Sequence, residues 1–216
     1  AYYNLVSKAS GNDPPAHSFC MCPGGRIVAS VHVAGRLCTN GMSNAAHSSP
    51  FANAAIVTTV GPESFGDGPL AGVDLQERLE RRFFDAGGRD YTAPVQRADD
   101  FLAGRRTVEP SRTSYTFGVR PDRIDQLLPE PIRDAIRLAL VRFERRIPGF
   151  AGPDGQLVGL ESRSSGPVRI PRDREARTAL GFANLYPVGE GAGYAGGIMS
   201  AALDGAHAAR ALLVRS

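Results

Sequence analysis

The residues best suited to chemistry stand near the C-terminal end of the sequence, in GEGAGYAGGI at 189–198. Gly191, Gly193 and Gly196 have the spacing GxGxxG, which usually opens a dinucleotide-binding βαβ unit. Glycines let the backbone approach a phosphate or a ring, and a following helix offers unpaired N–H groups and the positive end of its dipole. A βαβ unit needs a second strand after its helix, but this sequence ends at Ser216. Tight packing of a helix on a strand is the alternative explanation.

A second group of reactive side chains lies in and near SFCMCPGG at 18–25. A metal site could draw on five of them: His17, Cys20, Cys22, His32 and Cys38. The spacing C-x-C is not the C-x₂₋₄-C of zinc sites, so we predict no metal. Alternation along a strand would place Cys20 and Cys22 on one face. Inert packing and redox thiols beside a ligand both stay open as interpretations.

Two polar loops offer further candidates for a binding site. NGMSNAAH, from residue 40, contributes Asn40 and Ser43, which could line a pocket or satisfy one another in Asx turns. SRSSGPVR, from residue 162, contributes Arg163 and Ser164. An arginine there could face an anionic substrate or bind backbone carbonyls. No G-x-S-x-G, H-E-x-x-H or Walker pattern occurs in the sequence.

The first half of the sequence predicts strands followed by helices. RIVASVHV (26–33) and RLCTNG (36–41) flank Ala34-Gly35 as a hairpin would, and 52–60 predicts a further strand. DLQERLERRFFDAGG (74–88) repeats apolar residues every fourth position and ends in two glycines, which predicts a helix. A second amphipathic helix is predicted within 129–149.

The second half predicts a return to strands and a final helix. Strand character resumes within 157–171, and FANLYPVGE (182–190) predicts a strand leading into the glycines. An alanine-rich helix is predicted over 196–213.

Composition excludes several classes of protein. The 216 residues carry a net charge of only +3, without a dense basic run, so we expect no nucleic-acid partner. No apolar stretch reaches the ~18 residues of a membrane span. Three cysteines, an odd number, argue against a disulfide framework and favour a cytoplasmic location. The first residues begin inside a strand pattern without Met, so we expect a piece of a longer protein.

The segment NLYPVGEGAGYAGGIMSAALDG (184–205) resembles the closing, flavin-contacting segment of two-dinucleotide FAD enzymes. SFCMCPGG, NGMSN, APVQRADDFL and ESRSSGPVRIPRD resemble, in order, the blocks of a largely uncharacterised family of bacterial FAD-dependent dehydrogenases. Gly166 stands where a serine is expected. The resemblance implies an upstream half with its own Rossmann GxGxxG, so the closing segment needs no strand after its helix.

The resemblance also implies roles for individual residues. Glu190 would bind a ribityl hydroxyl, and backbone N–H groups of Gly196, Gly197 and Ile198 would face the flavin pyrimidine edge. The cofactor-binding set would comprise Gly189, Glu190, Gly191, Gly193, Gly196, Gly197 and Ile198. The set near substrate or flavin would comprise Cys20, Cys22, Asn40, Ser43, Arg163 and Ser164.

The predicted fold is α+β. A β-rich body (1–69) is followed by a helical excursion that covers a pocket (70–150), by return strands (151–177), and by the C-terminal segment (178–216). That last strand, glycine turn and helix would complete a Rossmann-like FAD-binding domain. The predicted function is the C-terminal fragment of an FAD-dependent oxidoreductase, inactive alone, with FAD, a small-molecule substrate and the N-terminal half as partners. A non-catalytic ligand- or partner-binding module and a small metal or thiol protein are the alternatives.

Overall fold

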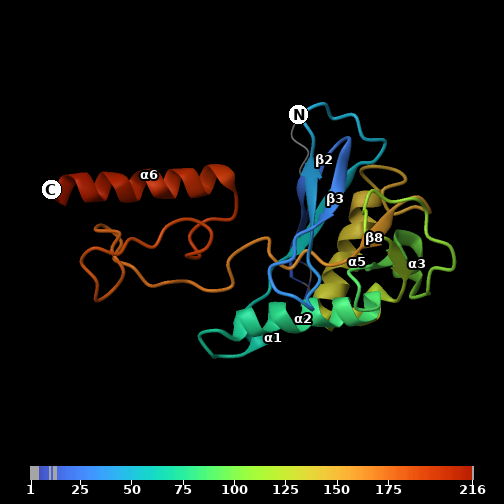
Figure 1. The fold of residues 1–216 in the computed structure, drawn as a ribbon, viewed down its shortest axis with the longest axis horizontal. Coiled ribbons are helices and arrows are strands. Elements are labelled where there is room, and N and C mark those ends of the chain that lie inside the picture. Colours follow the sequence, from blue (N-terminus) through green and yellow to red (C-terminus); the bar gives the residue numbers. More distant parts are fainter. Residues whose placement is uncertain (1–4, 10, 12–13, 216) are drawn as a thin grey trace. The chain divides into compact units, whose positions relative to one another are not determined.

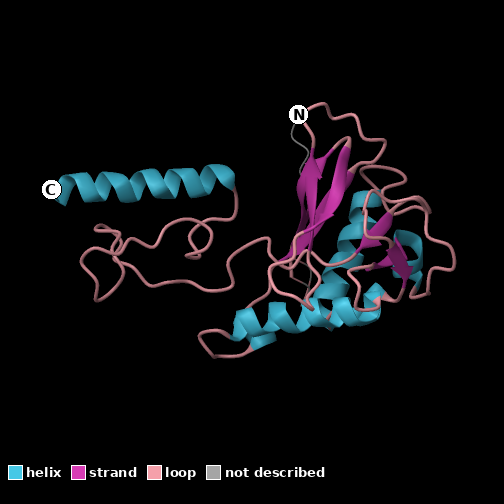
Figure 2. Ribbon diagram, viewed as in Figure 1, coloured by secondary structure: helices cyan, strands magenta, loops and turns pink. Residues whose placement is uncertain are grey.

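The computed structural model describes residues 5–9, 11 and 14–215, and the chain divides into two compact units. Unit 1 comprises residues 1–64 and 76–162, and unit 2 comprises 65–75 and 163–216. Figures 1 and 2 show small sheets together with helices. The mixed α+β class predicted from the sequence is confirmed, and each unit is described by itself.

The strands of unit 1 form three small sheets (Figure 2). The first is antiparallel, in the order β1 (Val6–Ser7), β2 (Ala16–Cys22), β5 (Asn53–Thr58). The second is the hairpin of β3 (Gly25–Ala29) and β4 (Thr39–Ser43). In the third, β6 (Ala93–Arg97) lies between β7 (Val119–Pro121), which is parallel to it, and β8 (Gln156–Val158), which is antiparallel.

Among the described residues five helices precede β8, and both long predicted helices are confirmed. They are α1 (Pro62–Phe65), α2 (Ala71–Gly87), α3 (Ala98–Ala103), α4 (Ile124–Leu127) and α5 (Glu130–Glu144). Helix α5 has a proline in its first turn, where a missing N–H removes no helical bond. Helix α3 ends at Gly104, which has a φ of 65° and adopts the left-handed conformation that closes many helices.

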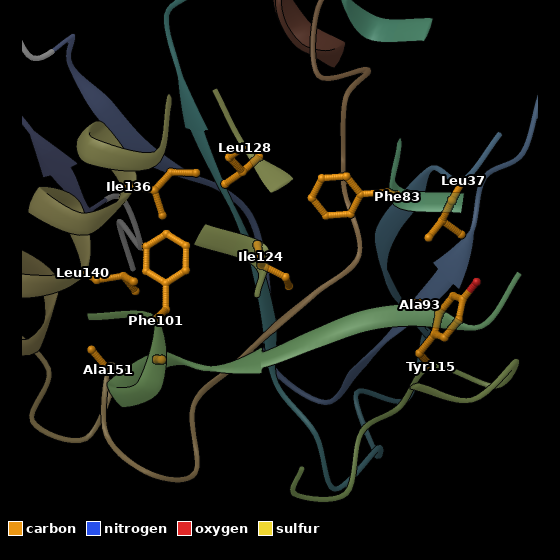
Figure 3. Close-up of a cluster of buried hydrophobic side chains, with 11 residues drawn as sticks. Leu37, Phe83, Ala93, Phe101, Tyr115, Ile124, Leu128, Ile136, Leu140 and Ala151 are labelled. Carbon is orange, nitrogen blue, oxygen red and sulfur yellow. The ribbon is translucent and has the colours of Figure 1, made fainter. Parts of the chain in front are cut away.

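The core of unit 1 is aromatic and aliphatic (Figure 3). Phe83 of α2 and Phe101 of α3 are fully buried, and Ile136 and Leu140 come from one face of α5. The side chain of Gln96, in β6, is buried in this interior and links β6 to α4 by hydrogen bonds. Its Nε2 donates to Asp125 Oδ1 of α4 at 2.8 Å, and its Oε1 accepts from the Asp125 backbone N–H at 3.0 Å. These bonds satisfy polar groups that would be costly to bury alone.

Unit 2 contains helix α6 (Ile198–Arg215) and, before it, long loops with one isolated bridge between Arg172 and Ala179. Among the described residues of unit 2, the buried apolar side chains are small: Ala179, Ala192, Ala208 and the ring of Pro187. Many of its larger apolar side chains are exposed, among them Leu180, Phe182, Leu185, Ile198, Met199 and Leu203. Unit 2 therefore has very little apolar core of its own.

The predicted hairpin forms in unit 1, and the chain turns at Ala34-Gly35, where Gly35 has a φ of +78°. Its strands are shorter than predicted, because β3 ends at Ala29 and β4 begins only at Thr39. Leu37 and Cys38 are instead buried, with Leu37 in the core, so this part of the chain leaves the ladder. The strand character within 157–171 is limited to β8, which ends at Val158.

The strand predicted over 182–190 does not form. Pro187 has no N–H to donate to a ladder, and its carbonyl accepts from Arg172 Nη1 at 2.5 Å. The glycine turn and the final helix are present, but the strand before them is not. The segment 70–150 contains β6 and β7 as well as helices. The four-part division and the covering role of 70–150 stay predictions.

Removing a core aromatic ring should destabilise unit 1 strongly. We expect Phe101→Ala to lower the free energy of unfolding by about 3–5 kcal/mol, because a fully buried ring is replaced by a cavity. The matched control is Phe117→Ala, whose ring is 57% exposed and should cost less than about 1 kcal/mol. Urea unfolding followed by circular dichroism measures both. Equal losses would contradict the assignment of Phe101 to the core.

Candidate functional site

The glycine segment of unit 2 is anchored by one buried carboxylate, Asp204 of α6. Arg172 donates to it through Nη1 at 2.9 Å and Nη2 at 2.6 Å, and Arg177 Nη1 lies 3.1 Å away. The backbone N–H of Gly189 donates to Asp204 Oδ2 at 2.9 Å. The side chains of Arg172 and Asp204 are only 5% and 10% exposed. Asp204 therefore joins the start of the glycine turn to the middle of α6.

Hydrogen bonding from Arg172 lowers the pKa of Asp204 to about 2, against the opposing effect of burial, and the Gly189 N–H adds to the shift. The Arg172 guanidinium also lies 3.5 Å from the ring centroid of Tyr194, and that of Arg169 lies 4.5 Å from the same centroid. The Tyr194 hydroxyl donates to the carbonyl of Ile170 at 2.9 Å. These contacts fix residues 169–172 beside the glycine turn.

Two glycines of the segment are required by the turn itself. Gly189 has a φ of +72° and Gly193 a φ of +80°, which other residues adopt at a cost. A Cβ at Gly193 would lie 2.6 Å from the carbonyl oxygen of Val168. The backbone N–H of Gly193 donates to the carbonyl of Glu190 at 2.9 Å. Local folding alone explains glycine at these two positions.

The other three glycines have no such explanation within the described structure. Gly191, Gly196 and Gly197 do not have positive φ values. A Cβ at Gly191 or Gly196 would meet no atom within 4 Å, and at Gly197 only Ser200 Oγ at 3.9 Å. The lack of a side chain there leaves open space directly before α6.

That space adjoins the N-terminus of an 18-residue helix with no acidic residue in its first turn. Ile198, the first residue of α6, is 89% exposed. The early N–H groups of a helix have no partner within it, so this end can receive a partial negative charge. No hydrogen bond or ion pair of the Glu190 carboxylate is found among the described residues, and the side chain is partly exposed. The residues of the sequence-predicted cofactor set thus follow one another along the loop before α6 and end at the first residue of that helix.

The two neighbouring cysteines of unit 1 do not share a strand face. Cys20 has a φ of +46°, and the β2–β5 register shifts between Phe19 and Cys22, so the predicted alternation fails at this bulge. Cys20 is exposed, Cys22 is half-buried, and its thiol donates to the Cys20 carbonyl at 3.2 Å. Within the described residues no disulfide forms, and no three His, Cys, Asp or Glu side chains gather as a metal site.

The structure places Glu161 near Cys22, a neighbour that sequence reasoning missed. Burial raises the pKa of Glu161. Burial, and then the charge of Glu161, raises the pKa of the Cys22 thiol. Cys22 lies opposite Asn53 in the pairing of β2 with β5. A Cβ at Gly25 would lie 2.7 Å from Asn53 Nδ2, and a Cβ at Gly41 would lie 2.2 Å from Asn53 Oδ1. For Asn53 the available signal was a single amide side chain in the run ANAAIVTTV at 52–60, whose other polar residues are two threonines.

The other residues predicted to lie near substrate or flavin are Asn40, Ser43, Arg163 and Ser164. Asn40 lies opposite Val28 in the hairpin. Ser43 Oγ is 3.0 Å from His47 Nδ1, and the Ser48 N–H donates to Asn44 Oδ1 at 3.3 Å, so this loop partly satisfies itself. Arg163 and Ser164 are half-buried and belong to unit 2, whereas Cys20, Cys22, Asn40 and Ser43 belong to unit 1. Their grouping into one pocket stays a prediction.

Comparison with known proteins decides the family. Residues 1–164 match the family described as FAD-dependent protein, C-terminal domain-like. The chain belongs to this family. It is also 40% identical over 216 residues to an uncharacterised protein of Clostridium beijerinckii, an alignment that covers 99% of this chain and 40% of that relative. The resemblance seen in the sequence is confirmed, and the chain spans well under half of its relative's length.

Replacing Asp204 should destabilise unit 2 in a pH-dependent way. A carboxyl with a lowered pKa contributes stability above about pH 4, and this contribution is lost as the pH falls towards 2. We expect Asp204→Asn to cost about 3 kcal/mol at pH 7, because Arg172 loses its buried partner. The cost should fall to roughly half at pH 3. Hydrogen exchange of the amides at 186–204 measures it.

The control for this experiment is Asp154→Asn, a change at an exposed carboxylate in unit 1. It should leave the exchange of the 186–204 amides unchanged. A cost for Asp204→Asn that is independent of pH would contradict the assigned role of the carboxylate.

The three thiols should differ in reactivity. At pH 8 we expect iodoacetamide to modify exposed Cys20 first, Cys22 more slowly, and buried Cys38 least. Glu161→Gln should accelerate the modification of Cys22 by removing a charge that raises its pKa. Peptide mass spectrometry measures each rate, with Glu63→Gln as the exposed control. An unchanged Cys22 rate in Glu161→Gln would rule out the coupling.

Proposed function

We propose that this chain is the C-terminal part of an FAD-dependent oxidoreductase and that its glycine turn contacts the flavin. The proposal rests on the open space at Gly191, Gly196 and Gly197. The chain's own packing and backbone conformation do not require glycine at these positions. Membership of a family of FAD-dependent proteins supports it. The family match ends at residue 164, so the role of the turn rests on its own geometry.

Each part of the turn has a distinct task in this proposal. The first N–H groups of α6 face the pyrimidine edge of the flavin, where negative charge is favoured by the helix dipole. The Glu190 carboxylate accepts a hydrogen bond from a ribityl hydroxyl. Asp204 positions the turn by holding the Gly189 N–H and Arg172 together. When bound, FAD supplies hydride transfer, and the protein supplies orientation and charge.

The exposed apolar residues of unit 2 support a further part of the proposal. A small unit whose buried apolar side chains are alanines and one proline, and which exposes Phe182, Ile198 and Met199, gains little from the hydrophobic effect. We assign this surface to the remainder of a longer protein, whose Rossmann-like domain unit 2 would complete. The greater length of the Clostridium relative supports this assignment. The substrate is a small molecule of undefined chemistry.

Membrane insertion has no support in the helices. Among the described residues, none of the helices combines the length and apolar character that crossing a bilayer demands.

A substitution at Gly197 tests the flavin contact directly. In the full-length protein, Gly197→Ala should fold normally, because a Cβ there meets only Ser200 Oγ at 3.9 Å. We expect FAD affinity to fall at least about tenfold, since the methyl group occupies the space assigned to the flavin. Fluorescence titration of the apoprotein with FAD measures the change.

Gly205→Ala is the matched control, because it lies inside α6 with no atom within 4 Å of the added Cβ. It should leave FAD affinity unchanged and stabilise the helix by up to about 1 kcal/mol. If both variants bind FAD like the parent protein, the glycine turn does not contact the flavin. A full-length protein that takes up no FAD would overturn the whole proposal.

A further inference from the structure

Unit 2 contains a pocket in which none of the glycine-turn residues takes part. It is a depression of about 650 Å³ that is broadly open to solvent. The loop before the glycine turn supplies Arg174, Glu175, Ala176 and Arg177. The C-terminal half of α6 supplies His207, Arg210, Ala211 and Val214.

The charges around this pocket are unbalanced. Three arginines line it against one acidic residue, Glu175. Across the part of the chain that the structure describes, no hydrogen bond or ion pair engages the guanidinium of Arg174 or Arg210. The nearby carboxylate of Asp173 is engaged by the backbone, because its Oδ1 accepts from the N–H groups of Glu175 and Ala176 at 2.9 Å and 2.7 Å. Two arginines are therefore available to an anion from outside the chain.

The third arginine is held in place. The Arg177 guanidinium is anchored by Asp204, with Nη1 3.1 Å from Oδ1. Its backbone has a φ of 60°, a left-handed conformation that is uncommon away from glycine and marks a constrained turn. That turn is closed by the Asp173 N–H donating to the Thr178 carbonyl at 2.8 Å, and by the Arg177 N–H donating to the Asp173 carbonyl at 3.1 Å. One wall of the pocket is thus preorganised.

We propose that this pocket binds a phosphorylated small molecule with at least two negative charges, of the nucleoside diphosphate class. Guanidinium groups match phosphate oxygens with paired, charge-assisted hydrogen bonds. The side chains of Ala176, Ala211 and Val214 offer an apolar surface to the uncharged part of such a molecule. This site is separate from the flavin contact proposed at the glycine turn, since it uses other residues.

Isothermal titration of the full-length protein with pyrophosphate and with ADP tests this proposal. The test variant is the double substitution Arg174→Gln and Arg210→Gln, which removes two unpaired charges. The control is the double substitution Arg145→Gln and Arg146→Gln, which removes the same number of positive charges from two exposed positions in unit 1. Flavin content is measured on all three proteins, so that loss of FAD is distinguished from loss of the second ligand.

The parent and the control should bind one equivalent of each probe, more weakly as salt is raised. The test variant should bind at least about tenfold more weakly while keeping its flavin content. Absence of binding to the parent, or equal weakening in both double variants, would overturn the proposal. A parallel loss of flavin in the test variant alone would also overturn it, because the arginines would then belong to the cofactor site.

Discussion

The ion pair between Arg172 and Asp204 organises unit 2. In most small units the apolar core fixes the loops, but here the buried apolar residues described are alanines and one proline, which contribute little transfer free energy. The carboxylate instead collects two guanidinium groups from the segment 172–177 and one backbone N–H from the start of the glycine turn. A buried pair of this kind adds modest net stability but strongly penalises any arrangement that separates its partners. Its main effect is to specify one conformation of the glycine turn.

Unit 1, in contrast to unit 2, has an extensive apolar core. Its sheets have only two or three strands, which are marginal on their own, so packing against helices is needed for their stability. Helix α5 packs against β1, β2 and β5 as well as against α3. The two hydrogen bonds between Gln96 and Asp125 then fix the position of α4 against β6 in that interior. Polar contacts select the arrangement, and apolar burial stabilises it.

Sequence reasoning succeeded where structure is local. Helices α2 and α5 were predicted because a helix repeats its apolar residues every three to four positions. The sheet of β6, β7 and β8 was not predicted, since its pairing joins residues far apart and its strands are only three to five residues long.

The candidate site was predictable to a similar extent. The glycine turn was located from its spacing and its helix from the alanine-rich tail, but the pattern could not separate the glycines that the turn requires from those it does not. That distinction depends on φ and on the neighbours of an absent Cβ. Asp204, Arg172 and Glu161 were not predicted either, because a charged residue in a sequence does not reveal whether it will be buried or which partner it will meet.

The discontinuous make-up of unit 2 has a consequence during synthesis. Residues 65–75 leave the ribosome long before 163–216, with most of unit 1 made in between. At translation rates of about 5–20 residues per second, that delay is on the order of ten seconds. Unit 1 therefore has time to collapse first. During this time Phe65 and Leu70 have been made, but residues 163–216 of their unit have not. The loop before α6 can be fixed only after Asp204 has been made, because this carboxylate holds Arg172, Arg177 and the Gly189 N–H together. The exposed apolar side chains of the 180–203 region are open to chaperones and to aggregation during this time, and folding of unit 2 alone does not cover them.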